Sequence, residues 1–269
     1  MKMTTRISLL CTSIFSLALF ANVASATHAW GSYHWGRTGH PFTLRLGDNV
    51  ASVWDPHLAT TSSDWSLSSI LDTTIVPGKT TSRKCRATIG RVEVCANKYG
   101  FNGWLGIAQI WVNGDHVVQG LAKMNDSYFN TSTYNSPAWR NLVMCQEVAH
   151  TFGLGHQDED FNNAPFGTCM DYSSDPTLNQ HPNPHDYDML EEIYAHLDTI
   201  NTYDSSPDDG SGDGGGGGNG HGKKNIESYE DLNHPAAWGK KVKDDLFVHD
   251  LGNDLKMFTF VFWTPHGQP

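Results

Sequence analysis

The chain has 269 residues, of which 38% are hydrophobic, and a formal net charge of −11 at pH 7. An acidic chain is repelled by the phosphate backbone, so the charge argues against non-specific nucleic-acid binding. Nine Trp and twelve Phe supply enough apolar side chains for a sizeable core.

Residues 1–26 predict a secretory signal peptide. Lys2 and Arg6 precede an apolar run over residues 7–23, and Ala24-Ser25-Ala26 forms a cleavage site. Polar residues interrupt the run, so we expect cleavage rather than a retained membrane anchor, and no other apolar stretch is long enough to cross a bilayer. Cleavage removes two bases and no acid, which takes the charge from −11 to −13. The expected location is extracellular, or periplasmic in a Gram-negative host.

The first part of the mature chain predicts alternating strands after an aromatic, histidine-rich segment. The aromatic and His residues there are Trp30, Tyr33, His34, Trp35 and His40. They could be metal ligands, but we expect aromatic packing. The expected strands cover 42–46, 69–76, 89–95, 105–112 and 116–125, with a short helix over 49–58. Asn113-Gly114 predicts a tight turn, and His116 beside it is expected to be structural rather than a ligand.

Residues 136–158 carry the most specific pattern. Ser136 and Pro137 fit the N-cap and first position of a helix. Gln146 and His150 lie one helical turn apart and point the same way. A glycine then breaks the helix, and His156 follows six residues after His150. This spacing is typical of a catalytic zinc site, which takes three protein ligands and keeps a place for water.

Each residue of this pattern has an expected role. His150 and His156 are predicted zinc ligands. The third ligand is Gln146, whose neutral oxygen suits harder ions better than zinc, or else Asp158. Glu147 is the expected general base, which takes a proton from the attacking water and passes it to the leaving amine.

A second motif follows at residues 167–172, Gly-Thr-Cys-Met-Asp-Tyr. Together the two motifs resemble the metzincin zinc metalloproteases, the clan of the matrixins and astacins, with Gln146 in place of the first zinc His. The resemblance covers roughly residues 40–200. It implies that Met170 lies in a Met-turn under the metal, and that Tyr172 is a fifth ligand or stabilises the oxyanion.

The resemblance also implies a fold and a substrate. The expected fold is α/β and zincin-like: a twisted mixed sheet with an antiparallel edge strand, a zinc helix, a Met-turn and a C-terminal helix. The edge strand would pair with the backbone of a protein or peptide substrate. The residues expected in that role are Gly106, Ile107, Ala108, Gln109, Ile110 and Trp111.

Four cysteines remain once Cys11 leaves with the signal peptide. An even count in an exported chain suggests two disulfides, for which three pairings exist. We favour Cys85–Cys95, which closes a local loop, and Cys145–Cys169, which ties the zinc helix to the Met-turn.

The remaining chain predicts one more helix, a linker and a small β-rich segment. Asn183-Pro184 begins the helix, with apolar residues at helical spacing after it. Residues 204–222 are a Gly/Asp-rich linker, and 223–269 hold aromatic strands of a small appendage. The predicted domains are thus a signal peptide (1–26), a catalytic domain (27–203), the linker and the appendage.

The leading hypothesis is a secreted metalloendopeptidase with one catalytic zinc ion. The alternative is a catalytically impaired protein of the same fold that binds peptides or a surface. Gln146 favours the alternative, whereas the retention of Glu147 favours the enzyme. A non-catalytic metal-binding protein is a weaker third idea, because the fourteen His are scattered along the sequence.

Overall fold

The computed structural model describes residues 27–203, 232–265 and 267, so the predicted signal peptide and linker lie outside the described residues. The strands are β1 (His34–Trp35), β2 (Phe42–Asn49), β3 (Leu71–Pro77), β4 (Val92–Asn97), β5 (Trp104–Asn113), β6 (His116–Asn125), β7 (Lys240–Lys241), β8 (Leu246–Gly252) and β9 (Leu255–Trp263). The helices are α1 (Asp55–Trp65), α2 (Asp126–Phe129), α3 (Pro137–His150) and α4 (Pro184–Ile193), with short 3₁₀ turns η1 (Pro176–Leu178) and η2 (Pro235–Ala237). Within these described segments, no helix combines the length and apolar character needed to span a membrane.

The strands form one nine-stranded mixed sheet in the order β3-β2-β4-β6-β5-β9-β8-β7, with β1 beside β6. The pairs among β2, β3, β4 and β6 are parallel, whereas β5 runs antiparallel to β6. The mixed α/β architecture predicted from the sequence is therefore present. The Asn113-Gly114 turn joins β5 to β6, as its residues require.

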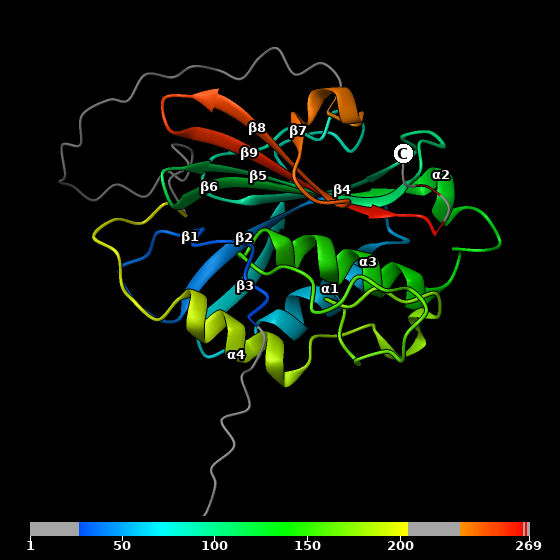
Figure 1. Ribbon diagram of the computed structural model, residues 1–269, viewed down its shortest axis with the longest axis horizontal. Helices are drawn as coiled ribbons and strands as arrows, with labels where there is room; N and C mark the ends of the chain where they lie inside the picture. Colours follow the sequence, from blue (N-terminus) through cyan, green and yellow to red (C-terminus); the bar gives the residue numbers. More distant parts are fainter. Residues whose placement is uncertain (1–26, 204–231, 266, 268–269) are drawn as a thin grey trace, which may run out of the picture.

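Helices α1, α3 and α4 lie on the same side of the sheet (Figure 1). Helix α3 packs on β5 and β6, and α1 packs on α3. Ser136 caps α3 by accepting from the N–H of Trp139, as expected for this N-cap. Gly106 of β5 lets α3 approach closely, because a Cβ there would lie 2.6 Å from the Glu147 Oε1 atom.

Helix α1 begins later than predicted, at Asp55 rather than Asn49. Asn49 is instead the last residue of β2, where it pairs with Cys95 of β4. Residues 50–54 form a bend and a turn, in which the Trp54 N–H donates to the Ala51 carbonyl at 2.7 Å, so the helix begins only after this turn.

The C-terminal strands differ from the expected appendage because they continue the main sheet. Strand β9 pairs antiparallel with β5 over nearly its full length, and β8 and β7 follow in turn (Figure 1). An edge strand offers unpaired backbone N–H and C=O groups, and β9 satisfies those of β5. Phe258, Phe260 and Phe262 alternate along β9, and all three join the central core.

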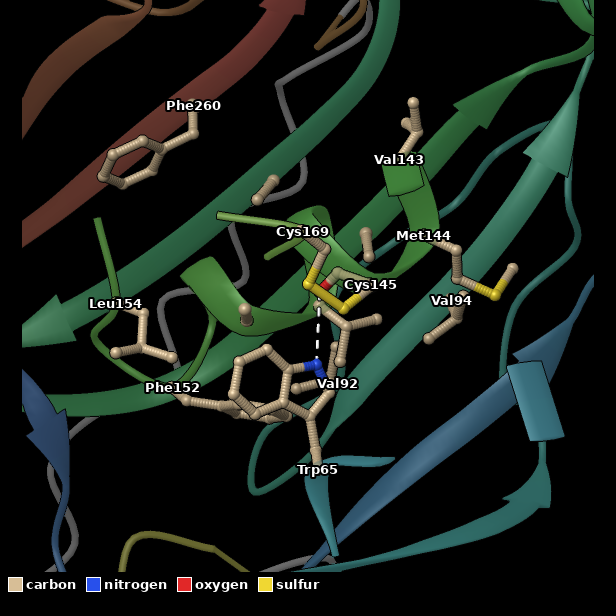
Figure 2. Packing of buried hydrophobic residues seen from close by; sticks show 14 of the residues in the cluster. Trp65, Val92, Val94, Val143, Met144, Cys145, Phe152, Leu154, Cys169 and Phe260 are labelled. Atoms are coloured by element: carbon tan, nitrogen blue, oxygen red, sulfur yellow. Dashed lines mark hydrogen bonds between the residues drawn. A yellow bond between two sulfur atoms is a disulfide. The ribbon is translucent and has the colours of Figure 1, made fainter. Parts of the chain in front are cut away.

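Disulfides join Cys85 to Cys95 and Cys145 to Cys169, which is the arrangement favoured among the three possible ones. The second links α3 to the loop that carries Met170 (Figure 2). Trp65 of α1 packs beside it and donates its indole N–H to the Cys145 carbonyl at 3.3 Å. Helix α3 is thus anchored on two sides close to the predicted site.

Candidate active site

The C-terminal turn of α3 carries Gln146, Glu147 and His150, all of which are buried. The helix ends at His150, and Gly153 then adopts a φ of +105°, a conformation that favours glycine. The chain turns back and places the His156 ring centroid 4.6 Å from that of His150. The structure therefore brings these predicted residues to one place at the end of α3.

Both histidines present a ring nitrogen suited to a metal. The Nδ1 atom of His150 lies 2.8 Å from the Leu154 carbonyl oxygen, to which it donates, so the proton is on Nδ1 and Nε2 carries a lone pair. The Nδ1 atom of His156 lies 2.8 Å from Asp245 Oδ2, and its buried Nε2 has no partner among the described residues. A carboxylate or carbonyl on the far nitrogen is the usual support of a metal-binding His.

The site contains further buried polar atoms without partners in the described part of the chain. They are the amide oxygen and nitrogen of Gln146 and both carboxylate oxygens of Glu147. Natural interiors satisfy nearly all such groups, each of which costs about 1–3 kcal/mol when left alone. A zinc ion bound by the Gln146 oxygen, with a water beside Glu147, would satisfy the acceptors among them, so the residues present fit this metal.

The electrostatics of the site follow from its burial. Burial raises the pKa of Glu147 well above its usual value, and the charge of the neighbouring His156 offsets this only in part. Burial likewise lowers the pKa of His150 well below normal. For His156, burial acts in the same direction, but Asp245 outweighs it and raises the pKa to about 9.

The segment expected to form a Met-turn, residues 167–172, lies against the segment that carries His156. The N–H of Gln157 donates to the Met170 carbonyl at 2.6 Å, and Met170 is fully buried. The Tyr172 ring consequently lies 4.5 Å from the His156 ring. The Tyr172 hydroxyl donates to the Val261 carbonyl of β9 at 3.2 Å, so in this structure the C-terminal strand engages it.

Asp158, the alternative third ligand, caps its own loop. Its Oδ1 atom accepts from the Asp160 N–H and from the Asn163 side-chain amide, both at 2.7 Å. Gln146 is left as the ligand candidate whose polar atoms have no other partner in the described segments.

Sequence reasoning missed Asp245, which lies just before β8. The N–H of Val261 in β9 donates to its carbonyl at 2.9 Å, and its carboxylate pairs with His156. The available signal was the second of two adjacent acids, Asp244 and Asp245, directly before the apolar run that begins at Leu246. Nothing in its spacing relates it to His156, because the contact depends on how β9 pairs.

The expected substrate strand is not a free edge in this structure. Strand β5 has β6 on one side and β9 on the other, with Ala108 opposite Phe260 and Gly106 opposite Phe262. The Phe260 ring stacks on His150 with centroids 4.2 Å apart, and the Phe262 ring lies 4.8 Å from Tyr172. Strand β9 thus covers the site as well as the strand.

A cavity of about 260 Å³ adjoins the covered site. Trp30 from the N-terminal segment forms part of its wall, together with His156, Asp245 and Phe260. The Trp30 indole donates to the His150 carbonyl at 3.0 Å, and its ring lies 4.8 Å from that of Phe258 in β9. The aromatic N-terminal segment therefore packs over the end of α3, as expected for it.

Comparison with known proteins gives little independent information. No family model matches the sequence, and no curated protein matches it. Among solved structures, the chain is similar to high choriolytic enzyme 1, a hatching enzyme zinc-protease from the medaka fish Oryzias latipes. The identity is 10%, and the match covers 61% of this chain and 95% of that chain with a TM-score of 0.32. Likeness at that level is too low to establish a shared fold.

Proposed function

We propose that this protein is a zinc-dependent metalloendopeptidase whose site is covered by its own C-terminal strand. The observation that carries the proposal is the set of buried, partnerless polar atoms on Gln146, Glu147 and His156 beside His150. Such a set is costly in a dry interior and is satisfied by a cation and a water.

His150 and His156 would hold the zinc ion through Nε2, and Gln146 would complete the protein ligands. Asp158 remains the alternative third ligand, provided its loop rearranges. When bound, zinc lowers the pKa of a water and polarises the scissile carbonyl. Asp245 keeps the His156 ring oriented by accepting from its Nδ1–H.

The protein side chains would handle the proton and the developing charge. The Glu147 carboxylate takes the proton of the attacking water and passes it to the leaving amine. Burial raises its pKa and so brings its basicity closer to what this transfer needs. The Tyr172 hydroxyl would donate to the carbonyl oxygen of the substrate once it releases the Val261 carbonyl.

An extended peptide substrate would pair with β5 at the place that β9 now holds. The register of β9 on Gly106–Trp111 shows that this edge accepts an antiparallel strand. The covered chain would therefore be latent, and β9 would have to leave before cleavage. Two disulfides are compatible with the proposed secretion.

The test combines zinc content with cleavage of a generic unfolded protein. Wild type is compared with Glu147→Gln, with His156→Ala and with Phe260→Ala, which loosens the covering strand. Glu192→Ala, an exposed acid on α4, is the matched control. We expect His156→Ala to lose one zinc ion, Phe260→Ala to cleave faster than wild type, and Glu147→Gln to abolish cleavage even when combined with Phe260→Ala.

One result would overturn the proposal: a folded protein whose zinc content is unchanged by His156→Ala and which does not cleave even as Phe260→Ala. That outcome would favour the alternative, a peptide- or surface-binding protein that keeps the arrangement of the site without turnover.

A further inference from the structure

A second histidine cluster lies where β1, the start of β6 and the segment after α4 meet. The parallel pairing of β1 with β6 sets His34 opposite His116. The segment after α4 adds His196 and Asp198. Their rings approach closely, with centroids 4.6 Å apart for His34 and His196 and 5.1 Å apart for His34 and His116. This cluster shares no residue with the candidate active site.

The ligand-type atoms of this cluster converge on Asp198. Its Oδ1 atom lies 3.1 Å from the Nε2 of His116, 3.3 Å from that of His34 and 3.6 Å from that of His196. The Nε2 atoms of His34 and His196 are 3.2 Å apart. Zinc bonds of about 2.0–2.2 Å in a tetrahedron place neighbouring ligand atoms about 3.3 Å apart. These four separations are close to that value. The group whose ligand atoms all lie within 4.8 Å of one another is His34, His116 and Asp198.

The proton positions also favour a cation at this point. The Nδ1 of His34 lies 2.7 Å from the Ser32 carbonyl and donates to it, so a neutral His34 turns the lone pair of Nε2 toward Asp198. Two acceptors that face each other at this distance need a proton or a cation between them. The contact to a backbone carbonyl on the far nitrogen is the support expected of a metal-binding His.

Arg37 fixes the acid from the opposite side. Its backbone N–H and its guanidinium reach the Asp198 Oδ2 atom at 3.0 and 3.5 Å, which leaves Oδ1 facing the histidines. The same guanidinium donates to the carbonyls of Tyr194 and His196 and so holds the segment that carries the ligands. The carboxylate is therefore positioned before any ion arrives.

The cluster is closed on one side and open on the other. The side chains of His34 and Asp198 are 5% and 9% exposed, whereas those of His116 and His196 are 29% and 58% exposed. The inner pair gives a site a fixed geometry, and the outer pair gives an ion a path from solvent.

We propose that His34, His116 and Asp198 form a second zinc site with a structural role, and that the exposed side chain of His196 turns to the ion as its fourth ligand. Four protein ligands leave no open position for a substrate, which is typical of structural zinc. The ion would tie the N-terminal segment, the central sheet and the segment after α4 to one another. Trp35, next to His34, donates to the Thr151 carbonyl at 2.8 Å, so the site would also steady the end of α3.

The test measures zinc binding directly on the full chain. The variant His116→Ala/His196→Ala removes the two more exposed ligands, which are the least needed for packing. His181→Ala is the matched control, because His181 is also exposed and also pairs with an acid, Asp64. Metal-free protein is titrated with Zn²⁺, and with Co²⁺ as a spectroscopic probe of tetrahedral geometry.

We expect one zinc ion per chain to depend on the cluster. The double variant should lose that ion, with affinity reduced at least about 100-fold, together with the corresponding tetrahedral Co²⁺ absorption. Zinc should raise the melting temperature of wild type and control more than that of the variant. Replacement of His156, the candidate active-site ligand, should leave this ion in place. A failure of the proposed peptidase function can therefore be distinguished from a failure of the second zinc site.

The proposal is overturned if wild type and double variant bind the same amount of zinc with the same affinity. It is equally overturned if, after dialysis, wild type retains no more zinc than the double variant does. In either case, hydrogen bonds and ion pairs join the His and Asp side chains of the cluster without a metal ion.

Discussion

The two histidine centres of this protein are built in different ways. His150 and His156 lie six residues apart and meet because one helix ends and turns back. The second centre collects His34, His116 and the 196–198 segment, which meet only because β1 pairs with β6 and α4 returns to them. A centre that one local turn builds can be read from its spacing, whereas a centre that three segments build cannot.

The centres also use their acids differently. Asp245 accepts from the Nδ1 of His156 and leaves Nε2 free, which makes it an orienting group. Asp198 faces the Nε2 atoms themselves, which makes it a candidate ligand. The nitrogen that each acid contacts therefore distinguishes the roles.

The largest effect is expected from a substitution in β9 that uncovers the centre at His150 and His156 and leaves the second centre unchanged. Phe260 is buried and stacks on His150, so Phe260→Ala should lower the free energy of unfolding by about 3–5 kcal/mol. Urea unfolding measures the loss, and zinc exchange should quicken at the first centre alone. Phe101→Ala is the control, because Phe101 is exposed and should change stability by less than about 0.5 kcal/mol. Equal losses in both variants would contradict the covering role of β9.

The next effect separates stability from metal binding. Replacing Cys145 and Cys169 by Ala should cost about 3 kcal/mol, because the bond closes a loop over a separation of 24 residues, and should also weaken zinc at the first centre. Replacing Cys85 and Cys95 should cost a similar amount without affecting either centre. Denaturant unfolding measures the stability of both variants, and zinc titration measures their metal binding. Identical zinc binding in the two variants would contradict a role of the Cys145–Cys169 disulfide in holding the site.

A smaller effect is expected when the first centre receives a third imidazole. Gln146→His would supply a third imidazole where a buried amide now has no partner in the described structure. We expect zinc to bind about tenfold more tightly there, because imidazole suits zinc better than a neutral carbonyl oxygen. Competition with a chelator measures the change. Unchanged or weaker binding would mean that Gln146 does not face the metal.

The smallest effect tests the contact between α4 and α1. The Tyr187 hydroxyl of α4 donates to the Asp64 carbonyl at 2.8 Å, and burial followed by the charge of Asp64 raises the Tyr187 pKa to about 12. The folded state favours the neutral phenol, so this stabilisation is complete below the unfolded pKa of about 10 and is lost as the pH rises through 12. Tyr187→Phe should therefore unfold with a weaker pH dependence between these values, which thermal unfolding measures. Parallel curves for the two proteins would exclude the contribution.

Local patterns account for much of the fold and for the core of the site. Ser136 and Pro137 fit the start of α3, and Asn183 caps α4 as its side chain allows. The spacing of Glu147, His150 and His156 holds because helix periodicity and one glycine turn act within a dozen residues. The start of α1 differs from the prediction, since Asn49 pairs with β4 and a turn occupies residues 50–54, and helical spacing shows neither.

The sequence by itself determined what short-range physics controls: the helix caps, the Asn113-Gly114 hairpin and the ligand spacing of the first centre. Only the tertiary structure decided that β9 fills the edge of β5, that Asp245 reaches His156, and that His34 and His116 face Asp198. Such contacts depend on the register between strands far apart in the chain. That register is selected by the whole of two facing surfaces, so no single residue or local spacing reveals it.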